Sequence, residues 1–511
     1  MKKILKMLFN RVVLVGLAIL VQVLLLILMV VKFQEYFVYF YAMCTVLSMA
    51  VVLIIVNGNS NPGYKIAWLI PVLLVPVFGG LFYVIFGGNR LRKPVKRKMS
   101  KVEEKMRLAL PPQEGMLEEL ESVSIDAANQ ARYIQTYAYC PVYTNTYTDY
   151  LPMGEIKFER MKEELRKAEH YIFLEYFIIQ EGTMWNAILE ILTEKVKQGV
   201  EVRLMYDDMG CIMTLPHHYE RQMEALGIAC CVFNPFIPVL SSRLNNRDHR
   251  KICIIDGHTG FTGGINLADE YINAYEKHGH WKDSSIILKG DAVWNLTVMF
   301  LAMWDDIRGI QEDYEKFKPQ VYQTVPEAKD GFVQPYSDNP LDDEIVGETV
   351  YFNLINKAKR YVYITTPYLI VDNEMVTALS TAAKSGVDVR IVTPHIPDKW
   401  YVHAVTRAYY ETLLQNGVRI YEYTPGFIHA KTFVVDDEYG TVGTINLDYR
   451  SLYLHFECGV WLCRTRSVLQ IKEDFLAMLP VCQEITLEQC QHVPWYRKLG
   501  RACLRIFAPL M

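Results

Sequence analysis

Two stretches of the chain carry the same five chemically distinctive residues at the same spacing. The first is HRKICIIDGHTGFTGGIN, residues 249–266, and the second is HAKTFVVDDEYGTVGTIN, residues 429–446. The shared residues are His249, Lys251, Asp256, Gly263 and Asn266 in the first copy, and His429, Lys431, Asp436, Gly443 and Asn446 in the second. Five such matches arise by chance at roughly one in three million starting positions, so the pattern predicts a function.

The histidine and the lysine of each copy are suited to binding an anion. Side chains alternate along a strand, so residues two apart project from the same face. Lysine supplies a positive charge and asparagine an amide donor, a combination that fits phosphate. Two copies facing each other would surround one phosphate with two of each residue. We therefore predict a phosphoryl-transfer site without a metal. A zinc site built from the two histidines is the alternative, which the neighbouring lysines disfavour.

The aspartate of each copy has a different expected role. Asp256 and Asp436 fall on the opposite parity from the histidine and lysine, at the point where each strand runs into a turn. We expect them to support or orient the site rather than to touch the same ligand atoms. Gly263 and Gly443 allow unusual backbone angles that would return each asparagine to the strand end.

The elements that must position these residues also occur twice. KAEHYIFLEYFI from Lys167 and GVEVRLMYDD from Gly199 match KAKRYVYITTPYLI from Lys357 and GVDVRIVTPH from Gly386, with a helical stretch between the members of each pair. Strand, helix, strand is the pattern of a parallel sheet covered by helices. A repeat of this length predicts a duplicated domain, with the join in the proline-containing stretch 318–343.

Bulk composition limits the alternatives. The chain has 511 residues, which is too long for one ordinary core and predicts two or three folded units. A net charge of −4 and a pI of about 6.3 argue against a dedicated nucleic-acid binder, which usually carries a basic surface. The eleven cysteines form no CxxC pair, so we expect small buried side chains rather than metal ligands or disulfides.

Three apolar segments precede the duplicated part. They are residues 12–31, 36–56 and 66–86, each about long enough to span a bilayer. The third contains Pro71, Pro76 and a glycine pair, so two spans plus a hairpin is the alternative. Basic residues cluster before the first segment and after the third. The positive-inside rule places both clusters in the cytoplasm, which two spans, or two plus a hairpin, allow.

The double HxK(x)4D(x)6GxxN pattern resembles the phospholipase D superfamily, and the sequences around it resemble its bacterial cardiolipin synthases. The matching stretches are HRKICIIDG, FTGGINLADEY, FIHAKTFVVDD, GTINLDYRS, YDD at 206–208, PYLIVDNEM from Pro367 and FGGNR at 86–90. The resemblance implies an α/β fold of two duplicated phospholipase D-like α/β/α sandwich domains packed face to face, preceded by N-terminal transmembrane helices. We expect membrane segments in 1–90, a basic linker in 91–125, the first domain in 126–325 and the second in 326–511.

The resemblance also implies a reaction. A phosphatidyl group would pass from one phosphatidylglycerol to another through a phosphohistidine, giving cardiolipin and glycerol. One histidine would attack while the other protonates the departing glycerol, and superfamily precedent favours His249 as the nucleophile. Asp283, in WKDSSI, and Glu457, in LHFECG, match the superfamily's acidic residues, each of which reaches across to orient the other half's histidine.

Partners and alternatives follow from the same resemblance. We expect phosphatidylglycerol and anionic membrane lipid as partners, and neither a cofactor nor nucleic acid. We expect a multi-pass location in the bacterial inner membrane, with the catalytic domains on the cytoplasmic face. The C-terminal stretch PWYRKLGRACLRIFAPLM is amphipathic, and either contacts lipid or packs on the domain. A phospholipase D, or a transferase with another acceptor alcohol, is the first alternative. A lipid-binding scaffold with an inactive site is the second, which the retention of both motifs disfavours.

Overall fold

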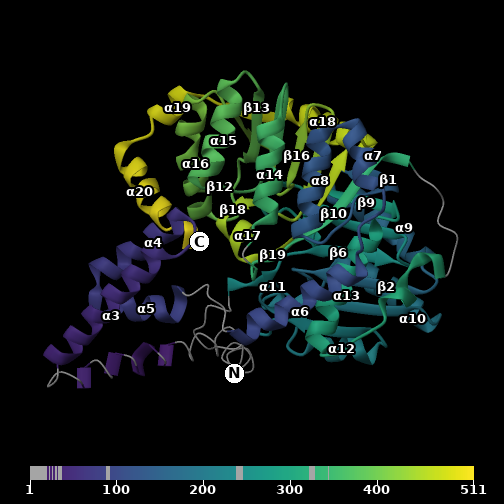
Figure 1. Cartoon of the computed structure of the whole chain (residues 1–511), viewed down its shortest axis with the longest axis horizontal. Coiled ribbons are helices and arrows are strands. Elements are labelled where there is room, and N and C mark those ends of the chain that lie inside the picture. Colours follow the sequence, from purple (N-terminus) through teal and green to yellow (C-terminus); the bar gives the residue numbers. More distant parts are fainter. Residues whose placement is uncertain are drawn as a thin grey trace.

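The computed structural model describes residues 37–87, 93–236, 245–321, 329–342 and 344–510, together with residues 20, 21, 23–25, 27, 28, 31 and 32. The first expected membrane segment, 12–31, therefore lies largely outside the described residues. Within the described part, a group of N-terminal helices lies beside a larger α/β body (Figure 1).

One mixed sheet runs through the α/β body and repeats its strand order. The first half contributes β1 (Tyr143–Leu151), β9 (Ser285–Gly290), β7 (Thr259–Gly263), β6 (Lys251–Ile255), β2 (Tyr171–Tyr176), β3 (Glu201–Asp207) and β4 (Ala229–Phe233). The second half contributes β10 (Lys329–Asp338), β19 (His455–Cys463), β17 (Tyr439–Gly443), β16 (Thr432–Val435), β11 (Tyr361–Thr365), β13 (Asp388–Pro394), β14 (Arg419–Tyr423) and β20 (Cys482–Ile485). The expected α/β class and its duplication are confirmed.

The two halves share this sheet. β1 and β10 pair antiparallel, with Tyr143 opposite Val333, so the strands of one half continue directly into those of the other. Within each half, the strand that follows the histidine (β6 or β16) pairs antiparallel with the first strand of the βαβ unit (β2 or β11). This arrangement fixes both histidine segments relative to one continuous framework.

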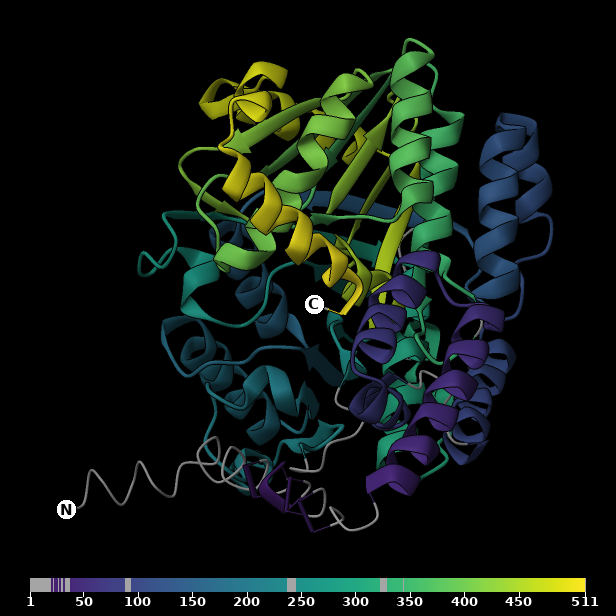
Figure 2. The same cartoon turned by 90° about the vertical axis from the view of Figure 1, so that its left-hand side faces the viewer.

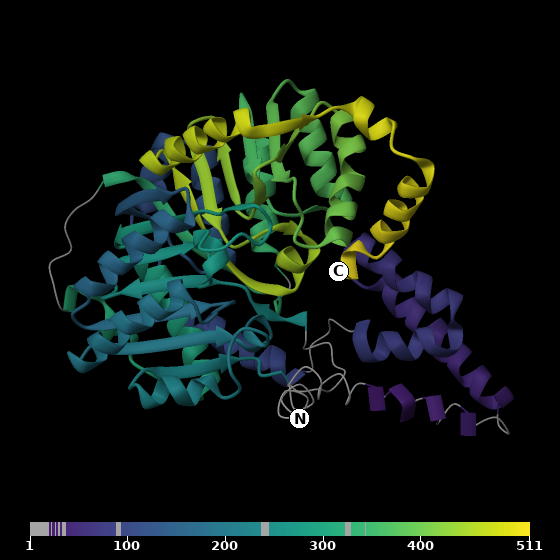
Figure 3. The same cartoon turned by 180° about the vertical axis from the view of Figure 1, so that it is seen from behind.

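Helices cover both faces of the sheet (Figures 1 and 3). In the first half they are α7 (Met116–Val123), α8 (Ile125–Tyr137), α9 (Gly154–Lys167), α10 (Thr183–Lys197), α11 (Asp208–Cys211), α12 (Tyr219–Ala225) and α13 (Val293–Arg308). In the second half they are α14 (Val346–Lys357), α15 (Asn373–Lys384), α16 (Trp400–Gln415), α17 (Tyr449–Tyr453), α18 (Arg466–Met478), α19 (Leu487–Gln491) and α20 (Trp495–Ile506).

The stretch expected as a basic linker is largely helical. It forms α6 (Lys93–Ala109) and then α7, and α6 packs against α13. Met99, Val102 and Met106 fall on one face of α6 and are buried, which explains why this charged helix docks on the body. An ion pair of 2.8 Å between Lys105 and Asp305 adds to the contact.

The N-terminal unit consists of α3 (Phe37–Asn57), α4 (Pro62–Leu74), α5 (Pro76–Phe82) and a π-helical turn at Tyr83–Gly87. Within the described residues, one helix, over Val38–Asn57, is long and apolar enough to cross a membrane. Residues 66–86 do not form one helix, because the chain breaks at Val75 before Pro76. α5 instead packs against α3, where the Ser48 hydroxyl donates to the Pro76 carbonyl at 2.6 Å.

The N-terminal unit contacts the second half through α4, which packs near the C-terminal helix α20 (Figure 2). Asn61 caps α4 by accepting a hydrogen bond from the Gly63 N–H, and its amide donates to Asp372 at 2.8 Å and to the Tyr453 hydroxyl at 3.0 Å. Tyr453 donates in turn to the buried Glu348. The start of α4 therefore lies against α17, the short helix next to the second motif.

The motif aspartates tie each turn to the start of a neighbouring strand. The Asp256 carboxylate accepts backbone N–H bonds from Glu169, His170 and Tyr171, each at 2.8 Å. Asp436 accepts the equivalent bonds from residues 359–361. Both aspartates have positive φ, 50° and 56°, which the tight turn requires. Both side chains lie at the end of the strand remote from the motif histidine, which favours a structural role.

We predict that Asp256→Asn lowers stability more than it lowers catalysis. The amide NH2 would face a backbone N–H that the carboxylate now accepts, at a cost of about 1–3 kcal/mol. The unfolding temperature should fall, whereas activity measured well below it should fall less than about tenfold. Asp126→Asn, at a partly exposed position outside the site, is the matched control. A variant that melts like wild type but is inactive would place Asp256 in the chemistry.

Candidate active site

The two histidine segments are held by strands of the opposite half. β5 (Arg247–Asp248) pairs parallel with β19, and the His249 N–H donates to the Phe456 carbonyl at 2.9 Å. By the same logic, β15 (Gly426–Ile428) pairs parallel with β8 (His280–Lys282), and the His429 N–H donates to the Lys282 carbonyl at 2.7 Å. Each histidine therefore lies in a short break between two strands, rather than within one strand as the spacing predicted.

This register places a carboxylate of one half beside the histidine of the other. His249 Nδ1 lies 2.9 and 3.0 Å from the two carboxylate oxygens of Glu457. His429 Nδ1 lies 2.7 Å from an Asp283 carboxylate oxygen. Both carboxylates are fully buried, so they act as acceptors that fix the proton on Nδ1. The lone pair of each ring is then on Nε2, available to attack phosphorus or to carry a proton.

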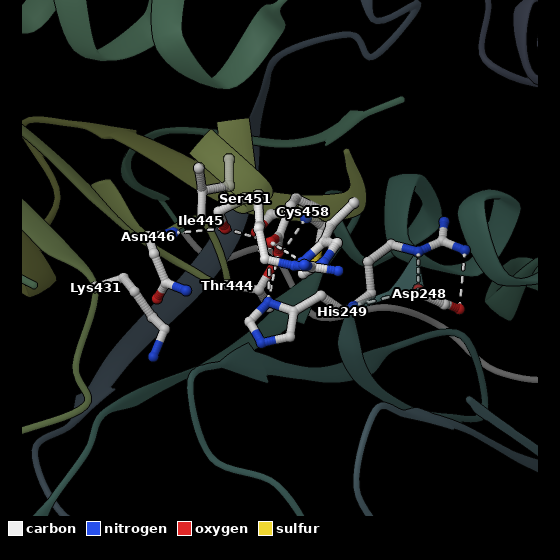
Figure 4. Close-up of polar contacts among 12 residues, drawn as sticks. Asp248, His249, Lys431, Thr444, Ile445, Asn446, Ser451 and Cys458 are labelled. Carbon is white, nitrogen blue, oxygen red and sulfur yellow. Dashed lines mark hydrogen bonds and ion pairs between the residues drawn. The ribbon is translucent and has the colours of Figure 1, made fainter. Parts of the chain in front are cut away.

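The two lysines of the motifs are buried beside the rings. The Lys251 ammonium donates to the carbonyl of His249 at 2.5 Å, and the Lys431 ammonium donates to the carbonyl of His429. In Figure 4, Lys431 and Asn446 lie on one side of the His249 ring and Asp248 lies on the other. The structure thus brings two cations to the place where the sequence predicted an anion site.

Burial and mutual repulsion shift the protonation of these groups. Desolvation, followed by the charges of Lys251 and Lys431, holds the pKa of His249 and of His429 well below the usual value. Burial also lowers the pKa of Lys251 to about 8 and of Lys431 to about 7, and raises the pKa of Asp283 to about 7. Both histidines are therefore neutral near pH 7 until a bound anion compensates the lysine charges.

The two motif asparagines differ. Asn266 is fully engaged, because its oxygen accepts the Ile178 N–H at 3.0 Å and its amide donates to the Tyr271 hydroxyl at 2.7 Å. Asn446 is buried beside Lys431, and its side-chain oxygen has no hydrogen-bond partner among the described residues. The sequence predicted two equivalent phosphate ligands. Among the described residues, Asn446 is therefore the less constrained of the two side chains.

The carboxylates also differ, through residues that the sequence analysis missed. Glu457 accepts hydrogen bonds from the hydroxyls of Thr444 and Ser451, which Figure 4 shows next to His249. Asp283 accepts the backbone N–H of Ser284 at 2.7 Å, and Gly264 occupies the position equivalent to Thr444. A position-by-position comparison of GGINLADEY with GTINLDYRS would have identified this difference.

A third histidine lies in the site. The ring of His455 is 5.5 Å from that of His249 between centroids, and its Nδ1 is 3.7 Å from a Glu457 oxygen. These three side chains offer ligand atoms within 4.8 Å of one another, so by spacing they could hold a metal ion. The adjacent cation of Lys251 opposes a divalent ion there. The set of two lysines and two carboxylate-oriented histidines suits displacement at phosphorus better than metal binding.

Comparisons with known proteins agree with this geometry. The family model described as "Cardiolipin synthase, PLD-like domain" matches residues 161–304 and 351–479, one match in each half. The model described as "Phospholipase_D-nuclease N-terminal" matches residues 46–88. An uncharacterized protein of Streptococcus mutans is 45% identical over 90% of this chain and 99% of its own length. A cardiolipin synthase of Halalkalibacterium halodurans is 33% identical over 92% of this chain and 94% of its own length.

A solved structure supports the fold. The phosphatidylserine synthase of Haemophilus influenzae superposes with a TM-score of 0.54 at 15% identity. The match covers 74% of this chain and 97% of the other.

We predict that anion binding at the site weakens as the pH rises from 6.5 to 9. Deprotonation of Lys431 and then of Lys251 removes the charges that hold the anion, since their pKa values are about 7 and 8. Sulfate stays dianionic over this range, so its affinity reports the charge of the protein. Calorimetry should show a dissociation constant that rises about tenfold or more.

Lys431→Gln should bind sulfate weakly at every pH and show a flatter profile. Lys472→Gln, which removes a lysine paired with Asp437 on the surface, should behave like wild type. An affinity that stays constant or rises with pH would contradict this assignment.

Proposed function

The chain belongs to the family of cardiolipin synthases with phospholipase D-like domains and is a phosphatidyltransferase, and from this premise we propose that it transfers a phosphatidyl group between two phosphatidylglycerol molecules. The products are cardiolipin and glycerol. The observation that carries the proposal is the pair of buried histidines, each hydrogen-bonded to a carboxylate of the other half and flanked by both lysines.

The reaction proceeds in two displacements. Nε2 of His249 attacks the phosphorus of the first phosphatidylglycerol, and the bond to the glycerol oxygen breaks. His429 donates its Nε2 proton to that oxygen, so glycerol leaves neutral. His429 then accepts the proton of a hydroxyl on the second phosphatidylglycerol, whose oxygen attacks the phosphohistidine and releases His249.

The different carboxylate environments support His249 as the nucleophile. Phosphorylation of Nε2 makes the ring cationic, and an ionised partner on Nδ1 stabilises that cation. Glu457 accepts hydrogen bonds from the hydroxyls of Thr444 and Ser451, which hold its two oxygens against the His249 ring. Burial raises the pKa of Asp283 to about 7, which makes it the weaker partner for a cationic ring. His429, beside Asp283, is then the group that passes the proton.

The lysines and Asn446 stabilise charge that builds up on the phosphoryl oxygens. Lys251 and Lys431 enter the site from opposite halves, so one phosphate contacts both. Binding of the phosphodiester anion offsets their repulsion of the histidines. The pKa of His429 rises accordingly in the complex, which allows it to start the reaction as the acid.

The lipid approaches from the side of the N-terminal helices. α20 runs beside α4 at this end of the molecule, and it exposes Trp495, Tyr496 and Leu499 (Figure 2). Aromatic residues and an adjacent basic face suit the interface of an anionic membrane. We place the catalytic halves on the cytoplasmic face of a bacterial inner membrane, with phosphatidylglycerol and anionic lipid, but no nucleic acid, as partners.

The principal alternative is a phospholipase D, in which water replaces the second phosphatidylglycerol. Both reactions use the same histidines, so the catalytic residues do not distinguish them. Purified protein should be given phosphatidylglycerol in detergent and the lipids separated. Cardiolipin and glycerol in equal amounts support the synthase; phosphatidic acid without cardiolipin supports the hydrolase, and no turnover contradicts both.

We predict that His249→Ala and His429→Ala each lower transfer by at least about 10⁴-fold, because each removes one of two groups that act as a unit. Initial rates of cardiolipin formation provide the measurement. His258→Ala, which removes a histidine outside the site, is the matched control and should retain transfer. Turnover within tenfold of wild type by either site variant would exclude the two-histidine scheme.

We also predict that EDTA leaves the initial rate unchanged within about twofold, because every group in the proposed displacement belongs to the chain. Loss of activity in EDTA that added zinc restores would show that His249, His455 and Glu457 hold a required metal.

A further inference from the structure

A second group of cationic and polar side chains, largely buried, lies next to the catalytic site. Arg450 is carried by the one-turn helix α17, which follows the second motif. Its backbone N–H donates to Asp448 at 2.9 Å, but its guanidinium forms no hydrogen bond or ion pair with the residues that the structure describes. The side chain is only partly exposed. A half-buried guanidinium without a partner indicates a missing anion.

Arg247 lies close enough to Arg450 to repel it. Burial lowers the pKa of Arg450 although the nearby Asp448 carboxylate opposes this, and the charge of Arg247 lowers the pKa further. Arg247 is 2% exposed and donates to the carbonyls of Asn246 and Asn234. Its Nη1 has no hydrogen-bond partner but forms an ion pair of 3.5 Å with Asp207. Two like charges held together in this way favour an anion between them.

His455 connects this pair to the catalytic histidine. It is the register partner of Arg247 across β5 and β19, and its ring lies 5.5 Å from that of His249. Both ring nitrogens of His455 are buried and have no hydrogen-bond partner among the described residues. The equivalent position in the first half is Trp281, whose indole Nε1 is also buried without a hydrogen-bond partner but cannot become charged. A group that can carry a positive charge therefore occupies this position beside His249 and not beside His429.

We propose that Arg450, with Arg247 and His455, forms a second phosphate subsite that holds the phosphodiester of the acceptor phospholipid. This inference rests on the proposed function, and it assigns selection of the acceptor to this subsite. Cardiolipin carries two phosphates joined by one three-carbon glycerol. When the first phosphate lies between Lys251 and Lys431, the second must therefore lie within a few bond lengths of it. The subsite next to His249 meets that requirement.

The subsite also explains how a lipid acceptor outcompetes water. In the second displacement, the acceptor oxygen forms a bond to phosphorus, the bond from phosphorus to His249 breaks, and the proton passes to His429. Water and glycerol can take this place, but neither carries a phosphate. Binding energy from the acceptor phosphate therefore accelerates transfer to phosphatidylglycerol alone.

The position of Arg450 near the N-terminal helices agrees with a lipid ligand. Tyr64 of α4 and Tyr401 of α16 are electrostatic neighbours of Arg450. Asn61, at the start of α4, contacts Tyr453, which is on the same short helix as Arg450. An acceptor anchored in the bilayer beside α4 would present its phosphate to Arg450 directly.

The test compares two acceptors that share one phosphohistidine. Cardiolipin formation uses phosphatidylglycerol as the acceptor, and exchange of deuterated glycerol into phosphatidylglycerol uses an acceptor without phosphate. Arg450→Gln should lower the initial rate of cardiolipin formation about 10- to 100-fold and change glycerol exchange less than about threefold. Arg464→Gln, which removes an exposed arginine paired with Glu438, should leave both rates unchanged.

Arg450→Lys separates charge recognition from folding. It retains the cation and should recover most of the cardiolipin rate that Arg450→Gln loses, with both variants unfolding at the wild-type temperature. Equal losses in the two assays, or an unchanged cardiolipin rate in Arg450→Gln, would overturn the subsite. The wild-type protein by itself tests the proposed function: if it exchanges glycerol but forms no cardiolipin, the proposed function is wrong.

Discussion

Each buried histidine of the site depends on a carboxylate that belongs to the other half of the chain. His249 is oriented by Glu457, and His429 is oriented by Asp283. A buried carboxylate without its partner is costly, so neither half can hold its own pair in isolation. The parallel pairing of β5 with β19 and of β8 with β15 sets the register that makes both hydrogen bonds possible. The shared sheet keeps these short strands in place.

The duplication supplies two similar sites, and a few substitutions make them unequal. Thr444 and Ser451 donate to Glu457, whereas Gly264 and Tyr271 occupy the equivalent positions near Asp283. A reaction in which one histidine attacks while the other moves a proton needs this inequality. The same asymmetry leaves His455 unpaired on the His249 side, where the second phosphate subsite is proposed.

The sequence predicted the parts of the site that depend on residue type and local spacing. The identical intervals in the two copies identified both His–Lys pairs, and side-chain parity separated Asp256 from them. It did not predict that His249 lies in a break between β5 and β6, because that break results from pairing with β19, some 200 residues away in the chain. The loss of Asn266 as a free ligand depends on a tertiary contact with Tyr271.

In the N-terminal region too, local sequence predicted some features, whereas others depend on tertiary contacts. Composition identified the apolar segments, and Pro76 indicated a break within the third. The packing of α5 on α3 depends on a contact between Ser48 and the Pro76 carbonyl that no local pattern specifies. The basic stretch after it forms a helix because Met99, Val102 and Met106 share a face that α13 buries.

The central claim is that the two halves place two unequal histidines on one phosphate, with His249 forming the covalent bond. The most direct test mixes the enzyme with phosphatidylglycerol and stops the reaction rapidly without acid or heat. The protein is then digested and its peptides are analysed by mass spectrometry. The account predicts a phosphatidyl adduct on the peptide that contains His249 within the first turnover. An adduct on the peptide that contains His429, or steady cardiolipin formation with no adduct on either histidine, would contradict it.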